Sequence, residues 1–141
     1  MEQQGVKKVI NAALRVPCTP ETFVRTWFKY LTQVHKLTEK EADVAAEFVK
    51  HYMALAKEMS DEEHINEILF SKKIKNQICK DLGLNQPYFR TILQNLRRNK
   101  IIVNGKLEKV YVPSYVPGEK FRLMFIFDDA ALLGGNNQSS Q

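Results

Sequence analysis

Two helical patterns joined at a single glycine constrain the fold of this chain more than any other feature. Ser71 is a residue type that caps helix N-termini, and the apolar residues after it recur at helical spacing. Gly83 stands where a left-handed residue closes a helix, and Asn85 caps a second helix almost at once. The sequence therefore predicts a helix over residues 72–82, a tight turn, and a helix over residues 86–99.

A strand pattern replaces the helical pattern directly after the second helix. Residues 101–103 are β-branched and lead into Asn104-Gly105, a dipeptide that favours a two-residue hairpin because both positions of a type I′ turn need a positive φ. We expect residues 106–112 to form the returning strand. Residues 121–127 alternate large apolar side chains and predict a further strand.

Another helix is predicted upstream of these elements. Thr38 and Glu41 have the spacing of a capping box, in which each residue bonds the backbone amide of the other. The apolar positions that follow predict a helix over residues 39–59. Residues 67–70 fit either a helical turn or a short strand, so this segment is left open.

The N-terminal part predicts additional helical structure. Residues 1–15 fit a short amphipathic helix, and Thr19 followed by Pro20 predicts a new helix start. The second of these helices would carry an apolar stripe rich in aromatic residues, made of Phe23, Val24, Trp27, Phe28, Leu31 and Val34. Packing onto the rest of the domain explains such a stripe, and self-association is the alternative.

Positive charge is concentrated in one part of the chain. The 141 residues carry a net charge of +5. Residues 72–109 hold ten basic and two acidic side chains, a net charge of +8, whereas the remaining 103 residues hold 11 basic and 14 acidic ones. A basic region in a mildly acidic protein is typical of nucleic-acid binding, although a solvated face without a partner has the same composition.

The predicted order of elements resembles the winged helix-turn-helix superfamily of DNA-binding domains. The turn Leu82-Gly83-Leu84-Asn85 with its flanking helices carries the resemblance, together with Asn99-Lys100-Ile101-Ile102 and the Asn104-Gly105 turn. The resemblance covers about residues 38–127. Within this superfamily, the chain is similar to small phage and plasmid regulators or replication initiators. It implies a mainly α fold with a C-terminal β-hairpin or small antiparallel sheet. The expected organisation is an N-terminal helical extension over residues 1–37, the winged helix-turn-helix domain over 38–128 and a disordered tail over 129–141.

The resemblance makes residues 86–99 the recognition helix and the hairpin the wing. Amide and guanidinium groups on the outer face of such a helix bind base edges in the major groove. The expected contacts from this helix are Gln86, Tyr88, Arg90, Thr91, Gln94, Asn95, Arg97 and Arg98. We expect phosphate contacts from the start of the preceding helix and from the wing, through Lys72, Lys73, Lys75, Lys106 and Lys109.

Two functions are therefore considered. In the first, the chain binds double-stranded DNA as a transcription or replication regulator, and a homodimer would extend the site it recognises. In the second, it is a phage virion, assembly or adaptor protein that uses the same scaffold for contacts with viral or host proteins. The predicted surface for self-association consists of Phe23, Trp27, Phe28 and Leu31.

Other classes of function lack support in the sequence. The three histidines and two cysteines have no metal-ligand spacing, and no phosphate-binding loop or catalytic constellation is present, so we expect neither an enzyme nor a cofactor or metal. No apolar run predicts a membrane span or a secretory signal. We expect a cytoplasmic protein, in the host cytoplasm or the virion if a phage encodes it.

Overall fold

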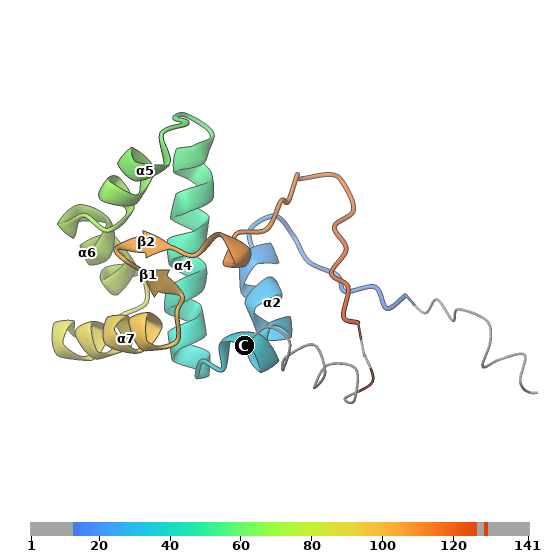
Figure 1. The fold of residues 1–141 in the computed structure, drawn as a ribbon, viewed down its shortest axis with the longest axis horizontal. Coiled ribbons are helices and arrows are strands. Elements are labelled where there is room, and N and C mark those ends of the chain that lie inside the picture. Colours follow the sequence, from blue (N-terminus) through green and yellow to red (C-terminus); the bar gives the residue numbers. More distant parts are fainter. Residues whose placement is uncertain (1–12, 127–128, 130–141) are drawn as a thin grey trace, which may run out of the picture.

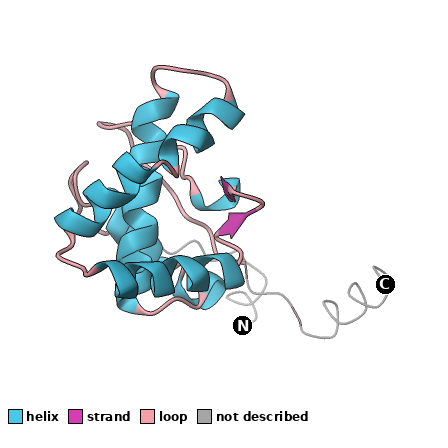
Figure 2. Cartoon of the chain, turned by 90° about the vertical axis from the view of Figure 1, so that its left-hand side faces the viewer, coloured by secondary structure: helices cyan, strands magenta, loops and turns pink. Residues whose placement is uncertain are grey.

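The computed structural model describes residues 13–126 and residue 129 and shows a mainly helical protein with one small hairpin (Figure 1). Its helices are α2 (Phe23–Tyr30), α3 (Thr32–His35), α4 (Glu39–Ala56), α5 (Glu62–Leu69), α6 (Lys72–Asp81) and α7 (Gln86–Arg98). The strands β1 (Ile102–Val103) and β2 (Lys106–Leu107) are followed by the 3₁₀ helix η1 (Lys109–Tyr111). In the described part of the chain, these two are the only strands (Figure 2).

The long helix α4 forms the centre of the fold. It contacts α2 on one side and α5, α6 and α7 on the other, an arrangement that Figure 1 shows clearly. Residues 44–46, 48 and 49 of α4 have no exposed surface. One hydrophobic core includes residues from α2 through η1, so the packing joins the expected N-terminal extension to the rest of the fold. The predicted capping box is confirmed, because Glu41 N donates to Thr38 Oγ1 and Thr38 N to Glu41 Oε1.

The two helices around Gly83 form as their caps predict. The Asn85 side chain accepts a hydrogen bond from Tyr88 N at 2.8 Å, and Ser71 Oγ accepts one from Ile74 N at 3.5 Å. Gly83 has φ of 65°, the left-handed conformation that glycine adopts with least strain. These local bonds explain why the helix boundaries were predictable to within a residue.

The predicted hairpin turn is also confirmed. Ile102 pairs with Leu107 and Val103 with Lys106, and the turn residues between them both have positive φ. The returning strand ends at Leu107, however, and not at residue 112. The chain turns into η1 instead, which buries Tyr111 in the core beside Phe28.

Residues 121–126 form no strand, which corrects the prediction made from their alternating pattern. Among the described residues their backbone has no neighbouring strand to pair with, and an isolated strand is not stable. Phe121 packs instead with its ring against the rings of Phe23 and Trp27, at 5.0 and 5.4 Å between centroids. The remaining apolar side chains of the segment are exposed, Met124 by 76%.

The bounds of two predicted helices need correction, and the segment left open is helical. The helix predicted over residues 39–59 ends at Ala56. Residues 67–69 belong to α5, since Asp61 caps a complete helix by accepting a hydrogen bond from Glu63 N. The helix expected at Pro20 begins at Phe23, because Thr19 and Thr22 first close a turn through mutual hydrogen bonds. Most of the helix predicted over residues 1–15, and the tail after residue 129, lie outside the described residues.

Candidate nucleic-acid interface

Helix α7 separates an apolar inner face from a polar outer face, as its sequence predicts. Phe89, Ile92, Leu93 and Leu96 are buried against the core. The outer face presents five exposed polar or charged residues, Arg90, Thr91, Gln94, Arg97 and Arg98. No other part of the described chain covers these side chains.

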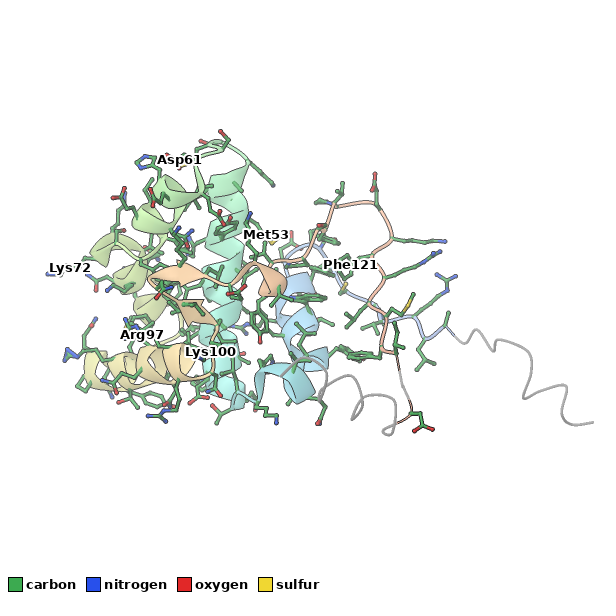
Figure 3. The ribbon with its side chains drawn as sticks, viewed as in Figure 1. Met53, Asp61, Lys72, Arg97, Lys100 and Phe121 are labelled. Atoms are coloured by element: carbon green, nitrogen blue, oxygen red, sulfur yellow. The ribbon has the colours of Figure 1, made fainter. Side chains whose placement is uncertain are left out.

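The start of α6 adds basic residues at the same end of the molecule. Lys72 and Lys73 are exposed in its first turn, and Lys75 is half-buried. Figure 3 shows Lys72 at the outer edge of the molecule on α6 and Arg97 nearer the hairpin on α7, both on the side of α4 opposite α2. Among residues 13–126, no ion pair joins a basic group on α6 or α7 to a carboxylate.

The basic residues of the hairpin region have a different environment. Lys109 Nζ lies 3.3 Å from a carboxylate oxygen of Glu62, and Lys106 Nζ lies 4.0 Å from one of Glu63. Both acids stand in the first turn of α5. These pairs were not predicted, because the sequence does not show that α5 lies beside the hairpin. The positive charge expected there is partly compensated within the chain.

Of the predicted DNA-contact residues, Asn95 is the one whose side-chain amide has hydrogen-bond partners within the chain at both ends. Its Nδ2 donates to Glu41 Oε2 at 2.7 Å, and its Oδ1 accepts a hydrogen bond from Arg98 Nη1 at 3.0 Å. The side chain is half-buried between α7 and the start of α4. Both ends of the amide therefore have partners within the chain. Glu41 was predicted only as a helix cap, and the second bond it makes could not be found from sequence spacing.

The first turn of α7 lies against the turn that precedes it. Tyr88 is 44% exposed, and Gln86 is exposed although its Nε2 lies 3.6 Å from Cys79 Sγ. The buried Cys79 thiol in turn donates to Leu84 O at 3.0 Å. This cysteine closes the turn between α6 and α7, as a buried thiol with a backbone partner does.

Comparison with known proteins does not identify a relative. No family model, curated protein or solved structure matches this chain. The assignment of a function therefore depends on the geometry and charge of the chain itself.

The aromatic residues predicted for self-association lie inside the chain. Phe23, Phe28 and Leu31 are buried and Trp27 is half-buried. Phe23 stacks on Tyr115 with 3.9 Å between ring centroids, and Trp27 Nε1 donates to Tyr111 O at 3.1 Å. These contacts favour packing within the domain over self-association for this stripe, of which Val34 remains 56% exposed.

Other kinds of site find little support in the described residues. No group of histidine, cysteine, aspartate or glutamate residues in residues 13–126 is arranged to hold a metal ion. A hollow of about 580 Å³ forms an open depression between α5 and the hairpin turn. None of the helices described is long and apolar enough to cross a membrane.

Proposed function

We propose that this chain is a winged helix-turn-helix protein that binds double-stranded DNA, as a transcription or replication regulator. In this proposal α7 is the recognition helix and enters the major groove. The observation that carries it is the positive charge on the surfaces of α6 and α7, whose exposed lysines and arginines form no ion pair with an acid in residues 13–126. Such a surface attracts the phosphate backbone and releases its counterions on binding.

The residue types on α7 support base recognition as well as phosphate binding. Gln94 carries an amide that can bind adenine through two hydrogen bonds, and Arg90 and Arg97 carry guanidinium groups that can bind guanine in the same way. All three are exposed on α7. Lys72 and Lys73 precede this helix in the chain and suit phosphate contacts, which fix the register of a protein on the duplex.

A titration of random-sequence duplex DNA at several salt concentrations tests the proposal. We expect Lys72→Glu with Lys73→Glu to weaken binding at least tenfold, and to flatten the dependence of affinity on salt because each lost phosphate contact removes about 0.9 from the logarithmic slope. The charge-matched control is Lys29→Glu with Lys57→Glu, two exposed residues away from α6 and α7. Equal affinity of the two double variants would reject the proposed surface.

One observation favours the alternative, a protein-binding role for the same scaffold. Met124 and Ile126 are 76% and 72% exposed, which is unusual for neighbouring large apolar side chains. Measurement of mass in solution and of retention on heparin separates the two functions. Self-assembly or partner binding without a salt-sensitive affinity for DNA would favour the protein-binding role.

A further inference from the structure

A chain of side-chain hydrogen bonds runs from the start of α4 to the outer face of α7. Glu41 Oε1 accepts from Thr38 N at 3.1 Å, while Glu41 Oε2 accepts from Asn95 Nδ2 at 2.7 Å. Asn95 Oδ1 then accepts from Arg98 Nη1 at 3.0 Å. The bond between Glu41 and Asn95 joins residues 54 apart in sequence, so it is a tertiary contact between two helices.

The donor and acceptor properties of these groups fix the direction of each hydrogen bond in this series. An ionised carboxylate only accepts hydrogen bonds, so Glu41 requires Asn95 to turn its NH₂ group toward α4. The amide oxygen of Asn95 must then point the opposite way. A guanidinium only donates, and Arg98 meets that oxygen with one of its five N–H groups. The identity of residue 41 therefore decides which end of the Asn95 amide faces Arg98.

We propose that Glu41 is a positioning residue, which acts through Asn95 to fix the direction in which Arg98 presents its remaining donors. The inference rests on the proposed function, because those donors are taken to bind DNA. Arg98 is exposed at the end of α7, and an arginine there otherwise samples many rotamers. A guanidinium that is oriented before DNA arrives loses less conformational freedom on binding. Asn95 accordingly serves Arg98 and does not itself contact the ligand.

The variant Glu41→Gln separates positioning from support of the fold. Glutamine serves as well as glutamate in a capping box, so its oxygen can still accept from Thr38 N and α4 keeps its cap. Its NH₂ group then faces Asn95, whose amide has to flip and turn its own NH₂ group toward Arg98. Two donors oppose each other there, and Arg98 is released. We expect DNA affinity to fall about two- to tenfold, the range for losing one preorganised side chain.

A second substitution is expected to restore the affinity. In Glu41→Gln with Asn95→Asp, the new carboxylate at position 95 accepts from both the Gln NH₂ group and Arg98, and the net charge equals that of the original chain. The matched control is Asn95→Asp alone, which places two carboxylates face to face and is expected to bind weakly. A role in folding alone predicts no such reciprocal rescue, because the cap remains intact in both variants with Gln at position 41.

Two measurements decide the inference. The first is DNA affinity of all variants with and without Arg98→Ala, where we expect Glu41→Gln to have little effect once Arg98 is gone. The second is the NMR signal of the Arg98 guanidinium in the free protein, expected to be distinct in the original and doubly substituted chains and averaged in Glu41→Gln. An unchanged signal in Glu41→Gln overturns the positioning role. If the original chain fails to bind DNA, the proposed function is rejected. The NMR signal still tests whether Glu41 orients Arg98 through Asn95.

Discussion

Leu107 donates its backbone N–H to the Asn66 side chain at 2.9 Å, and this bond fastens the hairpin to α5 across 41 residues of sequence. Asn66 is 3% exposed, and its Nδ2 donates in turn to Glu62 O at 2.9 Å. The Asn66 side chain thus accepts from the backbone N–H of Leu107 in β2 and also donates to the backbone carbonyl of Glu62 in α5. Because β1 and β2 are only two residues long each, the hairpin depends on such outside contacts for its place.

Replacement of Asn66 is expected to destabilise the protein markedly. Asn66→Leu leaves the Leu107 amide buried without a partner, which costs about 1–3 kcal/mol. Urea unfolding measures the change in the free energy of unfolding. Asn76→Leu, at an exposed position of α6, is the control and is expected to change it by less than about 0.5 kcal/mol. Equal effects of the two substitutions would contradict the role given to Asn66.

The buried His35 is expected to make stability depend on pH. Its ring is 2% exposed, Nδ1 accepts from Leu37 N at 3.0 Å, and Nε2 lies 2.8 Å from Phe28 O. Both bonds are satisfied only by the neutral ring with its hydrogen on Nε2. Burial lowers the pKa of His35 below its ordinary value of 6.5, and the bond to Phe28 O opposes the shift only in part.

A lowered pKa in the folded state fixes the sign of this effect. As the pH falls, the unfolded chain takes up a proton at His35 before the folded chain does. The stabilisation of the folded state by the neutral ring is therefore complete above pH 6.5 and is lost as the pH falls through the lowered pKa. We expect the free energy of unfolding of the original chain to fall more steeply below pH 6.5 than that of His35→Gln, by at most about 1.4 kcal/mol per pH unit.

Removal of the acids beside the hairpin is expected to strengthen DNA binding. Glu62→Gln with Glu63→Gln removes the carboxylates that lie 3.3 and 4.0 Å from Lys109 and Lys106. Both lysines can then bind DNA phosphates with their full charge, so the affinity for DNA should rise. The logarithmic slope of affinity against salt concentration should steepen by the equivalent of up to about two phosphate contacts. Glu58→Gln with Glu119→Gln, two exposed acids elsewhere, controls for the change in net charge.

Local chemistry explains which elements were predictable. The cap at Asn85 and the glycine at position 83 act within a few residues of themselves, and the helices around them form where the sequence predicts. The same holds for the Asn104-Gly105 turn. Residues 121–126 show the limit of this approach, because alternation is a strand signal only when a neighbouring strand exists to complete the hydrogen bonds.

The candidate site likewise has one part that the sequence predicts and another that depends on tertiary packing. Exposure of Arg90, Gln94 and Arg97 follows from helical periodicity alone, since the apolar stripe fixes which face turns outward. The engagement of Asn95 by Glu41 and the pairing of Lys109 with Glu62 do not follow from it. Each joins residues more than 40 positions apart, and only the packing of α5 and α7 around α4 brings them within hydrogen-bonding distance.

The sequence by itself determined the two helices that flank Gly83, the hairpin turn and the side of α7 that faces outward, because each depends on bonds and burial within a few turns of chain. The tertiary structure decided which of the polar groups remain available to a ligand. Hydrogen bonds and ion pairs are short-range and directional, so whether Asn95 or Lys109 is engaged depends on the positions of distant helices.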